Sequence, residues 1–492
     1  MATTKGRSKP SGGTAATRTS SPIDEIMLAA LERGGDSLET GRYLLTFKEG
    51  AAEEGLQSLG VQGQGMRVAN ARDFKDQAAT LESVGDADAV MFPEIGVALI
   101  GGDAAQERSM SAQAEIAADS PIESMDPEYF VFVQGTPGEF LRGLAEETES
   151  NPNEYLRGFL RAAETIIKDL RQGGRAQLEA EEEALVLGAT WGLHVCRVPP
   201  SLRSGAGIRV AVLDTGMDLG HPDFVGRPLV SATFVGQPVQ DLHSHGTHCI
   251  GTACGPKAPA GTTPRYGIGF RSSIFVGKVL SNSGSGVGGS VLAGVNWAVA
   301  NRCAVISMSL GSQSPVQPAY TAAGQAALNS SCLIIAAAGN AASFTGAPAN
   351  SPTIMSVASL DPTLRPSSFS NFGKIEIAAP GRDVFSSVPR PTRYGLKSGT
   401  SMATPHVAGC AALWAETSPN LRGMALRNRL RATARPLPLP ATRVGRRGPR
   451  PGTIKPECVR MGSRREGPPG GYAYVTEACY GQKEKMGCHD VG

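Results

Sequence analysis

Three apolar runs in the second half of the chain constrain its fold more than any other feature. They span residues 208–213, 304–308 and 333–338; the first ends at Asp214 and the last at a Gly339-Asn340 turn. Short apolar runs bounded by turn residues are typical of strands buried on both faces of a parallel sheet. Side chains at the ends of such strands lie where α/β sheets place their sites. We therefore expect an α/β domain with a largely parallel sheet and helices on both faces.

A histidine and a serine stand in two further segments that are rich in glycine. His245 opens the segment His-Gly-Thr-His-Cys, and Ser401 lies on a glycine-flanked turn where an apolar helix begins. A serine hydroxyl becomes a nucleophile when a base removes its proton, and an imidazole titrates in the right range to do so. A buried Asp214 would orient the ring and stabilise the imidazolium that forms.

Each of these residues also has a structural explanation when it is taken alone. Asp214 could be a strand-ending turn residue, and Ser401 could be a helix N-cap. His245 and His248 could bind zinc, but no further ligand cluster with suitable spacing follows them. The three segments in one order, together with Asn340, favour a nucleophilic site over these alternatives, and we predict no metal site.

The order Asp, His and Ser, with the Gly339-Asn340 turn before the serine, resembles the subtilisin family of serine peptidases over residues 190–438. The resemblance implies peptide-bond hydrolysis through an acyl-enzyme, with Asp214, His245 and Ser401 as the triad. It implies that Asn340 and the Ser401 backbone N–H stabilise the oxyanion, and that no cofactor is required. A peptide ligase or cyclase with the same triad, and a non-catalytic binding protein, are the alternatives.

The resemblance also implies where a substrate binds. Two segments would pair with the main chain of an extended polypeptide: Gly284, Ser285 and Gly286, and Ser309, Leu310 and Gly311. The S1 pocket would be walled by the second segment and by Ala337, Ala338 and Gly339, with Gly346 at its far end. These positions carry no acidic side chain, so we expect broad specificity with a preference for a large apolar P1 residue.

Calcium is possible by resemblance, because Asp223 matches a calcium ligand of many relatives. However, the loop that would complete the site, residues 255–265, has no carboxylate or amide side chain. Calcium prefers about six to eight oxygen ligands, so we expect Asp223 to be a capping or turn residue instead. Cys249 resembles a cysteine of proteinase K-like members of the family; alone it is explained as a small buried hydrophobe.

Composition narrows the partners and the compartment. The 492 residues are 41% hydrophobic, enough for one large core and smaller modules, and the nine cysteines cannot all pair within the chain. No apolar run is long enough to span a membrane, and no basic region is interleaved with aromatics, so we expect no nucleic-acid partner. Residues 1–21 lack the apolar core of a secretory signal, which weakly favours a cytoplasmic location over non-standard export.

The rest of the chain divides by composition. Residues 1–24, rich in Ser, Thr, Gly and Lys, should be disordered. Residues 40–104 resemble the inhibitory propeptide of the family, which implies a self-processing zymogen with this unit as its inhibitor; an unrelated small domain is the alternative. Residues 105–189 are expected to form an acidic helical linker, residues 190–438 the peptidase-like domain, and residues 439–492 a basic Gly/Pro-rich tail.

Overall fold

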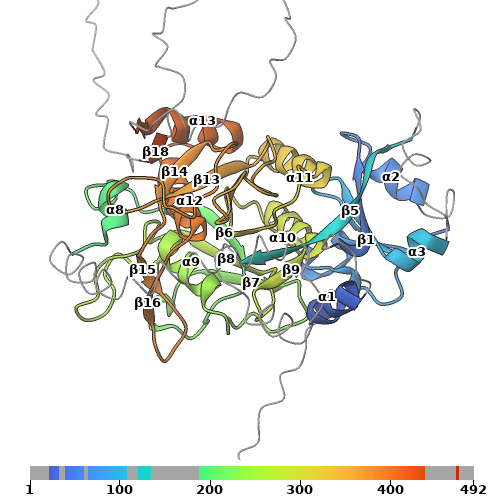
Figure 1. The fold of residues 1–492 in the computed structure, drawn as a ribbon, viewed down its shortest axis with the longest axis horizontal. Coiled ribbons are helices and arrows are strands. Elements are labelled where there is room, and N and C mark those ends of the chain that lie inside the picture. Colours follow the sequence, from blue (N-terminus) through green and yellow to red (C-terminus); the bar gives the residue numbers. More distant parts are fainter. Residues whose placement is uncertain are drawn as a thin grey trace, which may run out of the picture.

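The computed structural model describes residues 22–32, 39–59, 65–107, 120–133, 188–437 and 473–475. They form two units that lie side by side in Figure 1: an N-terminal unit of residues 22–133, and a C-terminal unit of residues 188–437 with 473–475. Within these ranges no helix is both long and apolar enough to cross a membrane.

The C-terminal unit is built on a nine-stranded sheet in the order β17-β18-β14-β13-β12-β10-β6-β8-β7. Neighbouring strands are parallel from β18 to β7, and β17 is antiparallel to β18. The strands are β6 (Arg209–Asp214), β7 (Leu229–Thr233), β8 (Ser273–Lys278), β10 (Val305–Met308), β12 (Leu333–Ala337), β13 (Met355–Leu360), β14 (Ile377–Pro380), β17 (Ala434–Pro436) and β18 (Ala473–Val475). The expected largely parallel sheet is confirmed.

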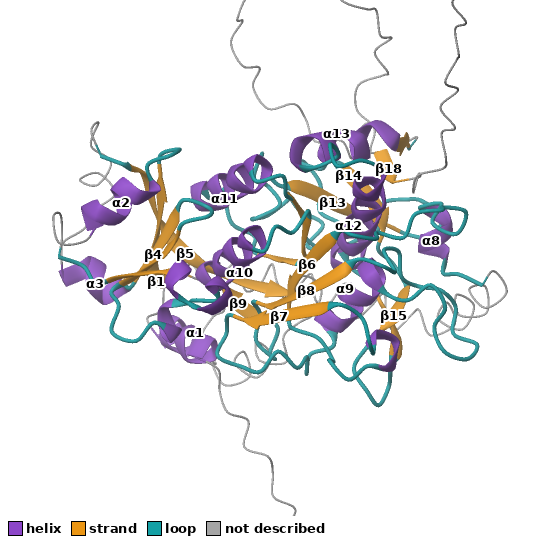
Figure 2. Cartoon of the chain, turned by 180° about the vertical axis from the view of Figure 1, so that it is seen from behind, coloured by secondary structure: helices purple, strands orange, loops and turns teal. Residues whose placement is uncertain are grey.

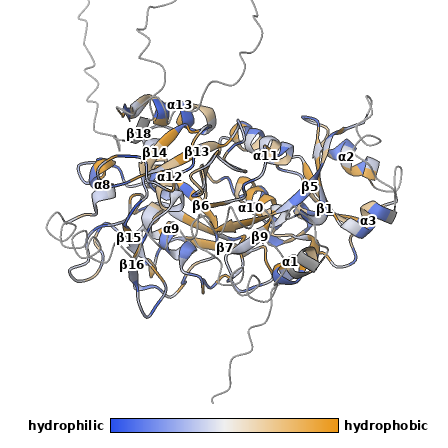
Figure 3. Cartoon of the chain, viewed as in Figure 1, coloured by the Kyte–Doolittle hydropathy of each residue, from blue (hydrophilic) through white to orange (hydrophobic). Residues whose placement is uncertain are grey.

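Helices cover both faces of this sheet (Figure 2). They are α8 (Trp191–Val195), α9 (His245–Cys254), α10 (Gly288–Ala300), α11 (Pro318–Asn329), α12 (Thr400–Thr417) and α13 (Gly423–Thr433), with a 3-10 turn η4 (Pro222–Phe224). Successive strand residues point to opposite faces. Val212 of β6 therefore packs with Ile250 of α9 and Val407 of α12, whereas Leu213 packs with Trp297 of α10. Figure 3 shows that the central strands are hydrophobic, as burial on both faces requires.

The N-terminal unit contains a smaller sheet in the order β5-β1-β4-β3-β2. Its elements are α1 (Pro22–Glu32), β1 (Glu39–Phe47), α2 (Ala52–Leu59), β2 (Val68–Asn70), η1 (Ala71–Asp73), η2 (Lys75–Gln77), η3 (Leu81–Ser83), β3 (Ala89–Phe92), β4 (Val97–Ile100), α3 (Gly102–Glu107) and β5 (Ile122–Val133). Strand β1 lies between β4 and β5 and is antiparallel to both.

Strand β5 links the two units (Figure 1). Its first part pairs with β1, and its last residues lie between β9 (Ser285–Val287) and β11 (Leu310–Gly311) of the C-terminal unit, antiparallel to both. The remaining pair of strands, β15 (Val384–Ser387) and β16 (Tyr394–Lys397), forms a separate antiparallel ribbon.

Strand β5 corrects the expected end of the first unit at residue 104 and part of the expected helical linker. Residues 122–133 form a strand of the first unit's sheet. The run Tyr129-Phe-Val-Phe-Val133 is aromatic and β-branched, which favours a strand whatever the acidic composition around it. The helix expected at residues 154–170 lies outside the described residues.

Two other boundaries also differ from expectation. Helix α1 begins at Pro22, inside the segment expected to be disordered, because Ile23 and Met27 lie one helical turn apart and are both buried. Ala473–Val475, in the segment expected to be a tail, adds strand β18 between β14 and β17. An open sheet edge offers unpaired backbone groups that such a segment can satisfy.

Candidate active site

Asp214 and His245 form a buried, hydrogen-bonded pair. Asp214 ends β6, and its Oδ1 lies 2.8 Å and its Oδ2 3.0 Å from Nδ1 of His245, the first residue of α9. The two residues are 1% and 3% exposed. The other ring nitrogen of His245, Nε2, has no hydrogen-bond partner among the described residues. The pair therefore has an oriented imidazole with one buried nitrogen left to accept a proton.

A network around Asp241 fixes the start of α9. The Asp241 carboxylate accepts hydrogen bonds from the backbone N–H and hydroxyl of Thr247 and from the hydroxyl of Thr215. Thr215 in turn accepts the backbone N–H of Gly246. Ser244, just before the helix, has a left-handed φ of 79°, which turns the chain sharply into His245. These contacts hold the histidine against the end of β6.

Ser401 lies in the first turn of α12 and is fully buried. Its hydroxyl donates to the Ser309 carbonyl at 3.2 Å, and the Ser309 hydroxyl donates to the Ser401 carbonyl at 2.8 Å. Pro405 lies four residues further along the helix and has no N–H to donate to that carbonyl. The Ser401 carbonyl therefore accepts side-chain donors instead, and these tie the serine to the end of β10.

Asn340 presents an unpaired donor at the same sheet edge. It follows β12 after Gly339, whose φ of 114° favours glycine. The Asn340 Oδ1 accepts both the backbone N–H and the hydroxyl of Thr400, at 2.8 and 2.9 Å. Its Nδ2 is buried and has no partner among the described residues. The side chain is thus oriented by its oxygen while its amide donor is left available.

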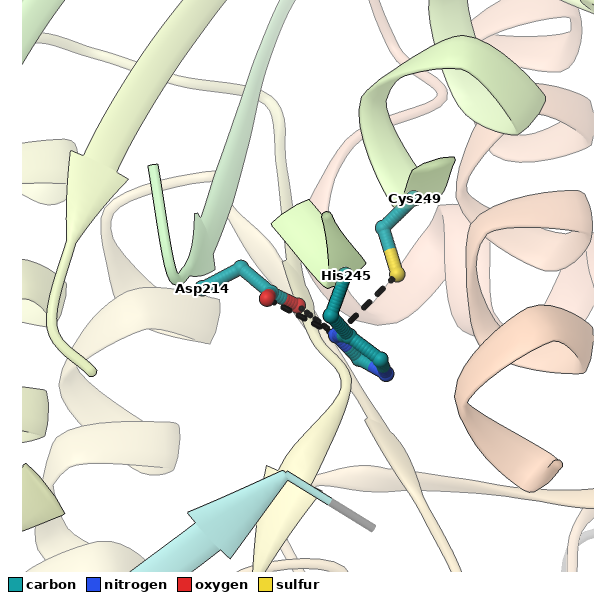
Figure 4. Close-up of side chains that lie close together, drawn as sticks. All are labelled: Asp214, His245 and Cys249. Carbon is teal, nitrogen blue, oxygen red and sulfur yellow. Dashed lines mark hydrogen bonds and ion pairs between the residues drawn. The ribbon is translucent and has the colours of Figure 1, made fainter. Parts of the chain in front are cut away.

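Cys249 packs behind the histidine, as Figure 4 shows. Its Sγ lies 3.8 Å from His245 Nδ1 and 3.6 Å from the Ser401 carbonyl oxygen. Burial and the neighbouring Asp214 charge raise the pKa of the Cys249 thiol well above its usual value. Asp214, His245 and Cys249 have ligand atoms within 4.8 Å of one another, close enough to hold a metal ion. Those atoms already make the hydrogen bonds described above, and the thiol keeps its proton.

The segments predicted to bind substrate line both sides of the end of β5. Ser285 and Gly286 pair with Phe132 and Val131, and the Gly284 carbonyl accepts the Val133 N–H at 2.9 Å. On the other side, Leu310 pairs with Val133 and Gly311 with Phe132. The structure therefore brings the two segments together around an extended stretch of the chain itself.

The predicted S1 residues also lie together. Ser309, Leu310 and Gly311 follow β10. Ala337 ends the neighbouring strand β12, and Ala338 and Gly339 follow it. Gly346 donates its N–H to the Ala338 carbonyl at 3.3 Å. A Cβ on Gly346 would collide with the Ser312 backbone oxygen, so only glycine fits this close approach.

The residues around Asp223 do not fit a calcium site. The hydroxyls of Tyr266 and Tyr394 donate to the Asp223 carboxylate, and the Asp223 backbone N–H donates to His221 Nδ1. Burial raises the pKa of Tyr266, with the Asp223 charge adding to the effect, so this hydroxyl remains a donor. The Asp223 oxygens thus accept hydrogen bonds from tyrosine hydroxyls where a calcium ligand would have to face the ion.

Sequence reasoning did not identify Asp241 or the end of β5. Asp241 precedes His245 by four residues, and an acidic residue that bonds backbone N–H groups just after itself is typical of an Asx turn before a helix. The run from Tyr129 to Val133 had a strand signal in its residue types. Its position between β9 and β11 had no signal in the local sequence.

Comparison with known proteins gives consistent matches over the C-terminal unit. The model of the subtilase family matches residues 205–455, about half of the chain. Subtilisin amylosacchariticus from Bacillus subtilis subsp. amylosacchariticus is 38% identical over 248 residues, which are 48% of this chain and 63% of that protein. Subtilisin from Bacillus pumilus is 37% identical over 248 residues, which are 88% of its length.

One solved structure, described as a cold adapted subtilisin-like serine proteinase, is 35% identical and covers 50% of this chain and 92% of its own, with a TM-score of 0.46. The chain thus spans less than two thirds of the first-named relative but most of the second.

Proposed function

The chain belongs to the subtilase family, and from that membership we propose that it is a serine endopeptidase that hydrolyses polypeptides through an acyl-enzyme. The observation that carries the proposal is a pair of buried, unpartnered polar atoms among the described residues: His245 Nε2, which can accept a proton, and Asn340 Nδ2, which can donate a hydrogen bond. Buried polar atoms without partners are costly and call for an explanation. These two stand out by position, because Asn340 bonds Thr400, next to Ser401, and His245 lies against Cys249, whose thiol contacts the Ser401 carbonyl.

We infer the following sequence of steps, in which the Ser401 hydroxyl first turns from the Ser309 carbonyl toward His245 Nε2. Ser401 Oγ attacks the scissile carbonyl carbon while its proton passes to His245 Nε2, and Asp214 stabilises the resulting imidazolium through Nδ1–H. Negative charge on the carbonyl oxygen is held by Asn340 Nδ2 and the Ser401 backbone N–H. His245 then gives the proton to the leaving amine as the C–N bond breaks. Water then gives a proton to the same ring and attacks the ester, and the ring returns that proton to Ser401 Oγ as the C–O bond to the serine breaks. No cofactor is needed in any step.

The N-terminal unit supports a polypeptide substrate because it places an extended segment of the chain between β9 and β11, a space that we call the cleft. Residues 130–133 are extended and pair with strands on both sides, which is main-chain binding independent of side chains. Val131 and Val133 pack into the core of the C-terminal unit. The small residues around the S1 pocket, none of them acidic, support a large apolar P1 residue.

The same strand supports synthesis as a zymogen that processes itself. Val133, the last described residue of β5, pairs with Leu310, which directly follows Ser309. The Ser309 carbonyl is in turn the acceptor for the Ser401 hydroxyl. We therefore expect the first cut in the segment that closely follows Val133, and the excised N-terminal unit then remains as an inhibitor.

Intact mass of the purified protein beside its Ser401→Ala form tests self-processing. The wild type should yield a fragment that ends close behind Val133, and the variant should stay full-length because it lacks the nucleophile. A wild-type chain that stays intact, or a variant that is cut at the same place, would contradict the assignment.

Activity and specificity are tested on a peptide library with the processed protein. Cleavage should be faster after Phe, Leu, Tyr or Met than after Lys or Arg, with Ser401→Ala inactive. Dominant cleavage after basic residues would show that the pocket is wrongly assigned, and products heavier than the substrates would indicate acyl transfer to an amine.

A further inference from the structure

Helix α1 packs across the end of β5, on the side that faces away from the C-terminal core. Ile23 and Met27 of α1 form a buried cluster with Phe130 and Phe132 of β5, with Val287 of β9 and with Val235. In this cluster, Met27 and Phe130 are fully buried. The helix therefore touches the strand in the cleft and the cleft wall at once, as its position below β9 in Figure 1 indicates.

The alternation of β5 explains why the helix can do this. Val131 and Val133 point into the C-terminal unit, while Phe130 and Phe132 point to the opposite side. Two aromatic side chains on that side would lie at the surface without a cover, and α1 supplies the cover. Helix α1 and the C-terminal unit thus hold β5 between them.

Polar contacts fix the position of the helix on the cleft wall. The Asp24 carboxylate accepts hydrogen bonds from the hydroxyls of Ser283 and Ser285, at 2.9 and 3.4 Å. Ser285 pairs with Phe132 of β5, and Ser283 lies two residues before it in the chain. Pro22 lies against Gly236, because a Cβ built on Gly236 would lie 3.3 Å from the proline ring. The helix is therefore attached to the C-terminal unit as well as to the strand.

We propose that the cleft wall carries a helix-binding face, made of Val235, Ser283, Ser285 and Val287, whose occupant is α1 of this chain, and that α1 clamps the inhibitory strand in the cleft. This rests on the proposed zymogen. Release of β5 then requires the loss of two sets of contacts: the β-ladder on its edges and the α1 cluster over its outer side chains. The clamp makes the excised N-terminal unit dissociate more slowly than the ladder alone would allow.

A matched pair of charge insertions on α1 tests the clamp. Met27→Asp places a carboxylate in the apolar cluster, whereas Ala29→Asp places the same group on the exposed side of the helix. The measured quantity is the lag in the full chain between two events: the first cut, detected by mass spectrometry, and full activity on an apolar-P1 peptide. This lag should be about 10-fold or more shorter for Met27→Asp. Ala29→Asp should behave as wild type. Equal lags for the two variants would overturn the proposal.

A second readout does not depend on catalysis. In the uncut Ser401→Ala protein, amide exchange of Phe130–Val133 should be roughly 10-fold or more faster with Met27→Asp than with Ala29→Asp, because unclamping opens the ladder. Equal exchange in the two proteins would overturn the clamp. A wild-type protein that never cuts itself would instead contradict the zymogen proposal. The exchange experiment would still decide whether α1 holds β5.

A pair of neighbouring acids separates the hydrogen bonds from the apolar contacts. Asp24→Ala removes the acceptor for Ser283 and Ser285, while Glu25→Ala removes an exposed acid from the same helix turn. Asp24→Ala should accelerate exchange of the same β5 amides a few-fold beyond Glu25→Ala. If both alanine variants exchange alike, Asp24 does not attach the helix to the wall.

Discussion

At the residue scale, the reacting groups are positioned by atoms that regular secondary structure leaves unpaired. The Ser401 carbonyl lacks its helical partner because of Pro405, and it accepts the Ser309 hydroxyl instead. Asn340 uses its oxygen for Thr400 and keeps its Nδ2 for another acceptor. Such pre-set donors stabilise developing charge without reorganising during the reaction.

Replacing Asn340 by Leu should lower kcat by roughly 100- to 1000-fold, the loss typical of a missing oxyanion donor in serine peptidases. The donor acts on charge that appears only in the transition state, so KM should change little. Steady-state kinetics of the processed protein on an apolar-P1 peptide measures both.

Thr400→Val is the matched control for this substitution. It removes one hydrogen bond to the Asn340 oxygen but keeps the bond from the Thr400 backbone N–H. Its kcat should fall much less than that of Asn340→Leu. A Leu variant within a few-fold of wild type would exclude Asn340 as the oxyanion donor.

At the scale of elements, β5 holds the start of α10 through one buried carboxylate. Glu128 is fully buried, and its Oε1 accepts the Gly289 N–H at 2.5 Å, in the first turn of α10. Its Oε2 accepts from Thr40 and from Arg42 Nε, at 2.6 Å each. A negative charge is favourable at a helix N-terminus, where backbone N–H groups lack intrahelical partners.

Glu128→Gln should weaken the hold of the N-terminal unit, because it removes the charge that pairs with Arg42 and with the start of α10. Truncating a buried charge pair typically costs about 2–5 kcal/mol, and part of this should appear as a lag to full activity that is 10-fold or more shorter. The lag is measured in the full chain after the first cut.

The control for Glu128 lies on the same strand. Glu123 is exposed, so Glu123→Gln makes the same chemical change without a buried partner. A Glu128→Gln protein that activates no faster than Glu123→Gln would mean that the carboxylate contributes only to folding of the N-terminal unit.

At the scale of the whole molecule, buried thiols are spread through the core of the C-terminal unit. Burial raises the pKa of Cys254 and of Cys303 to about 12, and it raises the pKa of Cys332 well above its usual value. These thiols stay protonated in the folded protein at pH values where the unfolded chain would ionise them. Each therefore makes folding less favourable as the pH rises above about 9.

Removing one of these thiols should reduce the amount by which the free energy of unfolding falls as the pH rises above about 9. Between about pH 9 and 12, the unfolded chain has lost the Cys303 proton and the folded protein retains it. The free energy of unfolding of the intact protein should therefore fall, relative to Cys303→Ala, by about 1.4 kcal/mol per pH unit.

Denaturant unfolding of both proteins in the Ser401→Ala background, which prevents self-digestion, measures this difference. At pH 7 to 8 the thiol is protonated in both states, so the difference between the two proteins should be constant there. A difference that stays constant up to pH 11 would show that Cys303 ionises in the folded protein as readily as in the unfolded chain.

The sequence by itself determined the parallel sheet and the positions of the candidate site residues. Burial on both faces leaves continuous apolar runs such as 208–213 and 333–338, and turns at their ends carry Asp214 and Asn340. These signals are local, because a strand and the turn after it are encoded in adjacent residues. The same locality placed Ser401 at a helix start, whereas the helix that begins at His245 was not predicted.

Only the tertiary structure decided what occupies the cleft and what covers it. Residues 130–133 have the composition of a strand, but their pairing with β9 and β11 depends on edges supplied by distant parts of the chain. Likewise, Ile23 and Met27 have helical spacing, but the apolar cluster that buries them exists only once β5 lies against β9. Strand partners and helix-packing sites are properties of the folded surface, so the local sequence does not encode them.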